Sequence, residues 1–338
     1  MRHLQTRTCI DPVSPTGTQH PTKDDPGGCD PGASATDTDT ATFMALRPRL
    51  FGLAYRMLGT RADADDVLQE AWLRWHRTDR GALQSGEAWL VTVVTRLSID
   101  RLRAVKVERE AYVGFWLPEP LVAVDEQGPE SVVELADDLS MALLRVLEQL
   151  SPEERAAFLL RQVFDHDYAD IAALLGKTEA ACRQLVHRAG LRVRQPRDSL
   201  PPAYTVPRQR HRALLQRFML AAQKGDRASL QALLADDVAL MGDGGGRVAS
   251  VRHVLRGAFR VTNLYWAVAL RCGDQVRYRQ VLVNGEPGLL RYVGGQLESA
   301  QAFVVQDERI VAVYVVRNPD KLARIALQGG DGAPLVTA

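Results

Sequence analysis

Polar side chains that could read nucleic acid gather on one segment near the middle of the chain. Between Lys177 and Arg197 there are six basic residues and one acidic residue, a net charge of +5 over 21 residues. Lysine and arginine attract DNA phosphates through counterion release, and arginine and glutamine can read base edges in the major groove. At helical spacing, one exposed face with its N-cap carries Thr178, Glu179, Arg183, Gln184, His187 and Arg188. The segment predicts a DNA-binding helix, and a solvated helix face is the simpler alternative.

Two further groups of polar residues lie closer to the N-terminus. The helical segment ending in "RLSIDRLR" carries Arg96, Asp100, Arg101 and Arg103, downstream of Trp89. Basic residues interleaved with an aromatic ring suit melted or single-stranded DNA, because unpaired bases stack on aromatic side chains. Upstream, "DADDVLQEAW" presents Asp66, Gln69 and Glu70 along one stripe. That stripe could dock a basic partner helix, and it could equally be an ordinary solvated face.

The glycine-rich stretch "MGDGGGR" at 241–247 raises the question of a phosphate-binding loop. Backbone N–H groups of glycine loops do cradle phosphates, but that pattern requires Gly-Lys-Ser/Thr leading into a helix. Arg247 is followed by Val248 and Ala249, so the hydroxyl that would hold magnesium is missing. The stretch instead predicts a flexible or tightly turned loop, since glycine permits positive φ angles.

Acid–base catalysis would need a positioned carboxyl, histidine or tyrosine group. The candidates in the C-terminal third are Asp243, His253, Asp274 and Tyr292, and no two of them have a spacing that demands catalysis. We therefore expect a protein that is not an enzyme and that needs no cofactor and no metal.

Composition limits the number of domains and the cellular compartment. The 338 residues suggest two or three domains, and 42 basic residues nearly balance 41 acidic ones. No apolar run is long enough to span a membrane, and the N-terminus lacks the apolar core of a signal peptide. Four scattered cysteines without a CxxC pair are typical of free thiols in a reducing compartment. These features predict a cytoplasmic protein that does not act at a membrane.

The first half of the chain predicts helices. Residues 1–41 are rich in Thr, Pro, Asp and Gly and are expected to be disordered. Residues 42–110 carry a three-helix pattern, with Gly59 ending the first helix and Ser85 as an N-cap. Residues 111–130 contain three prolines and a "WLPEP" motif and are expected to be a linker that is not helical.

The segment 131–197 predicts a second helical block. Ser151-Pro152-Glu153-Glu154 is a strong helix start, with an N-cap, a proline at the first position and two acids near the positive end of the dipole. A short helix then ends at Gly176 and a second begins at Thr178, which is the helix-turn-helix arrangement. Gly190 is expected to shorten that second helix.

A Pro-rich linker at 198–207 precedes a change of pattern. Residues 208–325 predict an α+β domain, with helices near 208–224 and 226–235 followed by a curved antiparallel sheet. The expected strands include "NLYWAVALRC" (263–272), "VRYRQVLVN", "GLLRYV", "QAFVVQ" and "RIVAVYVV". Residues 326–338 are expected to be a loose tail.

The helical blocks carry a resemblance to a known family. "LFGLAYRMLGTRADADDVLQEAWLRW" and "LSPEERAAFLLRQVFDHDYADIAALLGKTEAACRQLVHRA" resemble regions 2 and 4 of extracytoplasmic-function (ECF) sigma factors, over 43–197. The resemblance implies binding to core RNA polymerase, through the β′ clamp helices and the β flap, and to promoter DNA. It implies polymerase contacts by Asp65, Asp66, Gln69 and Glu70. It implies −10 reading and melting by Trp89, Arg96, Asp100, Arg101 and Arg103, and −35 reading by the helix that begins at Thr178.

Three motifs in the remaining chain narrow this resemblance. "FWLPEPL", "DGGGR" and "NPDKL" are similar to signatures of sigma factors with a fused SnoaL-like domain, the sigma-J type, although Arg247 stands where that family has lysine. The resemblance implies a SnoaL/NTF2-like cone that contacts the sigma domains and modulates them in cis. The implied contacts are the loop Asp243, Gly244, Gly245, Gly246 and Arg247 and the segment Asn318, Pro319, Asp320, Lys321 and Leu322.

Two other functions stay open on the sequence alone. A one-component helix-turn-helix regulator with a ligand-sensing cone would bind duplex DNA without polymerase, but it leaves the acidic stripe at 65–70 without a role. A SnoaL-like enzyme would need a base inside the cone, and fold analogy alone does not give function.

Overall fold

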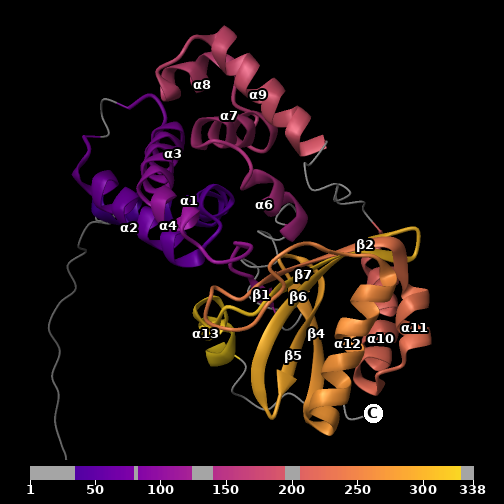
Figure 1. The fold of residues 1–338 in the computed structure, drawn as a ribbon. Helices are drawn as coiled ribbons and strands as arrows, with labels where there is room; N and C mark the ends of the chain where they lie inside the picture. Colours follow the sequence, from indigo (N-terminus) through magenta and orange to yellow (C-terminus); the bar gives the residue numbers. More distant parts are fainter. Residues whose placement is uncertain (1–34, 80–82, 124–139, 195–205, 329–338) are drawn as a thin grey trace, which may run out of the picture.

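The chain forms two helical blocks and a C-terminal α+β domain, as predicted (Figure 1). The structure is a computed structural model that describes residues 35–79, 83–123, 140–194 and 206–328. Across these ranges, no helix combines the length and the apolar character that crossing a membrane requires. The linker predicted at 198–207 falls largely outside the described residues.

The first block contains α1 (Ala35–Leu58), α2 (Arg61–Arg77), α3 (Gly86–Ala104) and the short α4 (Lys106–Glu110). Gly59 ends α1 with φ +73°, and the Ser85 side chain caps α3 by accepting from Ala88 N, as predicted. The expectation of disorder up to residue 41 is wrong for 35–41, which are helical. Composition misleads here because the apolar anchors of α1 begin only at the buried Phe43, about two turns after the helix starts.

The second block contains α6 (Met141–Leu147), α7 (Pro152–Gln162), α8 (Tyr168–Leu175) and α9 (Glu179–Arg194). Ser151 and Glu154 form a reciprocal capping box at the start of α7, and Gly176 makes the left-handed turn between α8 and α9. The expected shortening at Gly190 is wrong, because α9 continues to Arg194. A single helical glycine costs only about 1 kcal/mol, and burial of Cys182 and Ala189 on the same helix offsets that cost.

The C-terminal domain places its helices against a twisted sheet. Its elements are α10 (Arg208–Lys224), α11 (Arg227–Leu233), β2 (Leu234–Asp243), β3 (Leu255–Arg256), α12 (Ala258–Cys272), η2 (Gly273–Gln275), β4 (Val276–Val283), β5 (Glu286–Val293), β6 (Gln296–Gln306), β7 (Arg309–Val316) and α13 (Pro319–Gln328). The strand order is β1-β4-β5-β6-β7-β2-β3, and β1 (Val122–Ala123) comes from the linker between the helical blocks. The sheet is mixed rather than antiparallel, because β2 pairs with β7 in parallel.

The strand predicted at 263–272 is instead the C-terminal part of α12. Its β-branched and aromatic content suggested a strand, but its apolar residues follow a helical period. Val261 and Tyr265 are buried one turn apart, and Val268 packs partly buried against the same core. Periodicity is therefore the better guide here than propensity.

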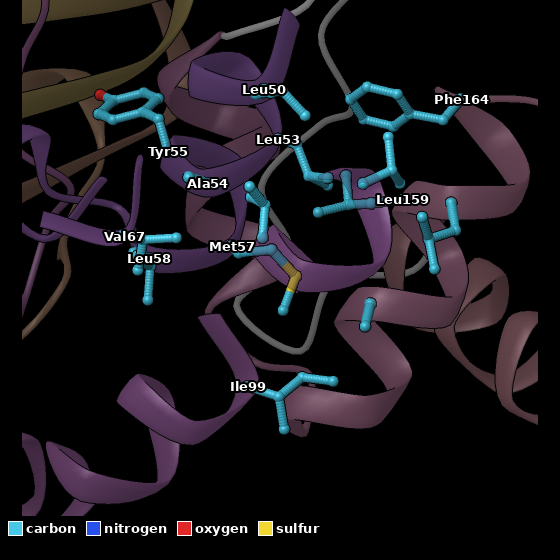
Figure 2. Packing of buried hydrophobic residues seen from close by; sticks show 14 of the residues in the cluster. Leu50, Leu53, Ala54, Tyr55, Met57, Leu58, Val67, Ile99, Leu159 and Phe164 are labelled. Atoms are coloured by element: carbon cyan, nitrogen blue, oxygen red, sulfur yellow. The ribbon is translucent and has the colours of Figure 1, made fainter. Parts of the chain in front are cut away.

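Three apolar clusters hold the fold together. The first is shared by both helical blocks, and Figure 2 shows Leu50 and Leu53 of α1 beside Phe164 of the second block. The second lies between the helices α10–α12 and one face of the sheet. The third covers the opposite face with Leu117 of the linker, Met141 of α6 and residues of α13. The linker and α6 thus belong to the C-terminal core as well as to the helical blocks.

A partly buried acid predicts a pH dependence of folding. Glu286 begins β5, and burial raises its pKa from 4.5 to about 7, while the nearby Arg208 opposes that shift. The folded chain therefore holds this proton more tightly than the unfolded chain does, and stability falls as the pH rises from about 4.5 to about 7. We expect Glu286→Gln to raise the melting temperature at pH 8 and to leave it unchanged at pH 4. Asp237→Asn, at an exposed position of β2, should change neither, and an equal gain at both pH values would contradict the assignment.

Candidate functional site

The three signature motifs of the sequence meet around one buried carboxylate. Asp243 is the last residue of β2 and is fully buried. Its side chain accepts hydrogen bonds from Lys321 Nζ (2.7 Å), Leu117 N (2.9 Å), Tyr112 Oη (2.5 Å) and Gly245 N (3.0 Å). These donors belong to the linker, the glycine loop and α13. We call this cluster the Asp243 hub.

Lys321 is the cationic half of the hub. Its ammonium group also donates to Leu117 O (2.5 Å) and lies 4.0 Å from the centre of the Trp116 ring. Burial lowers the pKa of Lys321, and the Asp243 carboxylate opposes that shift. Asn318 extends the network, since its side chain donates to Tyr112 Oη at 2.9 Å. The linker is therefore held from both its backbone and its side chains.

The glycine loop is tightly turned around this network. Gly245 and Gly246 have φ angles of +62° and +71°, and a Cβ on Gly245 would lie 2.4 Å from Asn318 Nδ2. A Cβ on Gly244 would lie 2.3 Å from Val248 O. The Gly245 amide faces Asp243, so the loop binds a carboxylate of its own chain where a phosphate loop would bind an anion.

The remaining motif residues flank the hub. Arg247 pairs with Asp320 at 3.0 Å, and both side chains are exposed. Pro319 begins α13, and Leu322 is buried in the third apolar cluster.

A second joint connects α1, the linker and the sheet. The Tyr55 hydroxyl donates to Glu119 O (2.5 Å) and accepts from Asn284 Nδ2 (2.8 Å). The Asn284 side-chain oxygen accepts from Leu121 N (3.2 Å). Asn284 occupies the two-residue turn between β4 and β5 with φ +52°. Its side chain thus ties the first helical block and the linker to one hairpin.

Sequence reasoning did not single out Tyr55, Glu119 or Asn284. The Asn-Gly pair at 284–285 carried a usable signal, because it is the strongest short hairpin marker. That signal gives the turn but not what the asparagine side chain contacts.

The acidic stripe lies on the surface of α2. Asp66 and Gln69 are exposed, and among the described residues neither has a hydrogen-bond or ion-pair partner. Glu70 pairs with Arg74 at 2.9 Å. Asp65 pairs with residues of three helices: Arg47 (3.5 Å), Arg61 (3.7 Å) and Arg324 of α13 (3.4 Å).

The polar residues of α3 are engaged with both helical blocks. Arg101 pairs with Asp63 at 2.7 Å, and the half-buried Trp89 lies 5.7 Å from the Trp75 ring. Arg103 contacts Asp100 and also Glu153 of α7, at 2.5 Å from the latter. Arg96 Nε donates to Leu174 O of α8 at 3.2 Å. Two arginines of this surface therefore contact the helix-turn-helix block.

The predicted DNA-binding face of α9 is more exposed to solvent than the polar face of α3. Glu179, Arg183, Gln184, His187 and Arg188 are all exposed, and Thr178 Oγ1 accepts from Ala181 N at the start of the helix. Arg183 pairs with Glu179 at 2.6 Å, and Arg188 lies 3.4 Å from Glu154 of α7. Cys182 is fully buried beneath this face, as predicted.

The four candidate acid–base groups do not gather into one site. Asp243 is saturated by its four donors, His253 and Asp274 are exposed, and Tyr292 is partly buried elsewhere. Within the described ranges there is also no group of three or more His, Cys, Asp or Glu side chains that could hold a metal.

Comparisons with known proteins agree with the order of these elements. The family "Sigma-70 region 2" matches residues 42–107, and "Sigma-70, region 4" matches residues 140–191. The chain is 38% identical over 295 residues to the ECF RNA polymerase sigma factor SigJ of Mycobacterium tuberculosis, covering 84% of this chain and 93% of that protein.

Two further comparisons extend over most of the chain. A second Mycobacterium tuberculosis protein, named "Probable ECF RNA polymerase sigma factor SigI", is 31% identical over 310 residues, covering 88% of this chain and 100% of that protein. The crystal structure of the Mycobacterium tuberculosis extracytoplasmic function sigma factor SigJ superposes with a TM-score of 0.69 at 35% identity, covering 84% of this chain and 98% of that chain.

The hub makes a prediction about stability. Lys321→Met keeps the aliphatic stem but leaves a buried carboxylate without its counter-ion, so we expect a loss of about 3 kcal/mol in the free energy of unfolding. This is the low end for a broken buried pair, because three other groups still donate to Asp243. Arg247→Gln breaks the exposed pair in the same two motifs and should cost less than about 1 kcal/mol. Chemical unfolding of the full chain measures both, and equal losses would contradict the central role of Lys321.

Proposed function

Because this chain belongs to the ECF RNA polymerase sigma factor family, which acts in transcription initiation, we propose that its C-terminal domain adjusts that activity in cis. The observation that carries the proposal is the pair of hydrogen bonds by which Asp243 and Lys321 hold the backbone of Leu117 in the linker. This linker joins the two helical blocks, so the domain that holds it controls how far the blocks can separate.

For the polymerase, we assign the acidic stripe of α2 to the β′ clamp helices and the second helical block to the β flap. Asp66 and Gln69 support the first assignment because they are exposed and have no partner within the described residues. An acidic surface of this kind favours a basic partner, since complementary charge speeds association and fixes orientation.

For promoter DNA, we assign the exposed face of α9 to the −35 element and the polar face of α3 to the −10 element. Arg183, Gln184 and Arg188 have the side chains that read base edges and bind phosphates. Trp89, with the arginines of α3, supplies the combination of ring and charge that suits a melted strand.

The arrangement of the two blocks supports a closed resting state. Promoter elements centred about 25 base pairs apart are separated by about 85 Å along B-DNA, at about 3.4 Å per base pair. In the structure Arg96 of α3 contacts α8 directly, and Arg103 contacts α7. The two surfaces must therefore move apart before they can engage both elements together. Control by the C-terminal domain is then a shift of population between closed and open forms.

The helix α13 supports a second route of control. Arg324 pairs with Asp65, which is one of the residues assigned to the polymerase. Because this pair is exposed, it contributes little energy by itself. It brings the C-terminal domain to the edge of the proposed docking surface, so the two partners would compete for Asp65.

The sigma factor family is not enzymatic, and we extend that statement to the C-terminal domain of this chain. The engagement of Asp243 by four donors supports it, because a general base must be able to reach a substrate proton. The chain acts in the cytoplasm under this proposal, because core polymerase and promoter DNA are found there.

The docking assignment predicts the effect of a charge reversal. Asp66→Arg should weaken binding of the full chain to core RNA polymerase by about ten-fold or more, because like charges placed together across an interface are costly. Fluorescence anisotropy of the labelled chain with core enzyme measures this. Asp274→Arg reverses an exposed charge far from the stripe and should bind normally. Unchanged binding by Asp66→Arg would contradict the assignment.

Control in cis predicts that loosening the closed form increases transcription. Lys321→Met removes the hydrogen bond from Lys321 to the Leu117 backbone of the linker. Glu153→Arg places a positive charge beside Arg103 and changes no residue of the C-terminal domain. We expect Glu153→Arg to raise run-off transcription by about two- to five-fold, since an exposed ion pair is worth up to about 1 kcal/mol. Lys321→Met should raise it by at least as much, because it breaks a buried pair. The template is a promoter selected by the holoenzyme from random DNA, and Asp165→Arg, at an exposed position after α7, is the control.

The two variants separate the parts of the proposal. An increase with Glu153→Arg alone would mean that the closed form exists but that the C-terminal domain does not control it. Activity of neither wild type nor variants, together with tight binding to duplex DNA alone, would favour a one-component regulator instead.

A further inference from the structure

The C-terminal domain has a solvent-open cavity of about 540 Å³ between α12 and the sheet. Leu264 and Val268 of α12 form one wall, and Val293 and Val315 lie on the sheet side. The size falls in the range of small-molecule sites, which are mostly apolar with a few converging polar groups. The cavity lies on the opposite face of the sheet from the linker and α13, which pack with the third apolar cluster.

The polar groups of this cavity are predominantly cationic. Arg271, Arg291, Arg317 and Glu298 line it, three positive charges against one negative. Arg291, whose side chain is only 7% exposed, donates to Glu298 at 2.6 and 2.7 Å. Arg317 also pairs with Glu298, so one carboxylate serves two arginines and the lining keeps a net positive charge. Glu298 therefore neutralises one arginine and not the set.

Two arginines that line the cavity have a donor or a whole side chain without a partner among the described residues. Arg317 Nε is buried and has no hydrogen-bond partner among the described residues. Arg271 is exposed and likewise has no partner in that part of the chain, so it lies where the cavity meets solvent. A carboxylate between these side chains would satisfy both, since guanidinium groups bind carboxylates with charge-assisted hydrogen bonds.

We infer that the cavity binds a small amphipathic organic monoanion. Its carboxylate contacts Arg271 and Arg317, and its apolar body lies against Leu264, Val268 and Val293. A neutral or cationic molecule of the same shape would leave the excess positive charge unbalanced, so charge rather than shape sets the selectivity.

The cavity shares its wall with the Asp243 hub. Gly242, which lines the cavity, precedes Asp243 in β2, and the backbone N–H of Arg317 donates to Asp243 O at 2.7 Å. Arg317 is followed directly by Asn318, whose side chain holds Tyr112 of the linker. If the domain acts in cis as proposed above, occupancy of the cavity would bias the linker. This regulatory step, unlike the binding itself, rests on the proposed function.

Binding is tested with the full chain by isothermal titration calorimetry. The probes are decanoate and 1-naphthylacetate, with decanol and decyltrimethylammonium as neutral and cationic counterparts of the first. We expect at least one of the two anions to bind with a stoichiometry of one and both counterparts to bind at least about ten-fold more weakly. No heat of binding from either anion, or equal binding of anion and cation, would overturn the inference.

Two variants locate the site. Arg271→Gln removes a charge that makes no contact within the described residues, so it should keep the fold and weaken anion binding by about ten-fold. Val268→Trp should fill the cavity and abolish binding. Arg252→Gln, an exposed residue that does not line the cavity, is the matched control. Binding that survives Val268→Trp in a folded protein would overturn the location.

Measuring transcription in the presence of the bound anion then separates binding in the cavity from its effect on the linker. Binding that depends on Arg271, with no effect on transcription, would support the cavity and overturn its link to the linker. Absence of binding, with a transcription change in Lys321→Met, would overturn the cavity and leave control in cis standing.

Discussion

The buried pair between Asp243 and Lys321 is the interaction on which the arrangement of the three parts depends. Asp243 is the last residue of β2 and Lys321 lies in the first turn of α13. Both side chains also bind the backbone of Leu117. A buried ion pair adds little net stability, but each half is costly without the other. The linker must therefore occupy its position for the hub to be satisfied, and this couples the helical blocks to the C-terminal domain.

The linker is consequently a structural element of two domains at once. It adds the edge strand β1 to the sheet, buries Leu117 in the C-terminal core, and reaches Tyr55 of α1 through the carbonyl of Glu119. The helical blocks share an apolar core of their own across α1, α3 and α7. Separation of the blocks would therefore break packed apolar contacts and arginine contacts together.

Local rules of sequence determined most of the helical half. Ser85 and the Ser151–Glu154 box mark helix starts, Gly59 and Gly176 mark turns, and the charged residues between 179 and 188 mark one exposed face of α9. These features are set by hydrogen bonds and φ angles within a few residues, so they can be read without the rest of the chain. Where a local rule competed with packing it failed, as in the strand predicted at 263–272, whose aromatic and β-branched residues form a helix against the sheet.

The sequence by itself determined the family, the three-part order and the motifs, because short-range patterns and motif spacing survive without contacts. Only the tertiary structure decided that Asp243, Lys321 and Tyr112, which are more than seventy residues apart in every pair, share one buried site. It also decided that Asn284 reaches Tyr55, that β2 and β7 run parallel, and that Arg96 and Arg103 contact the second block. These outcomes depend on which surfaces exclude water together, and that is a property of the packed chain rather than of any segment within it.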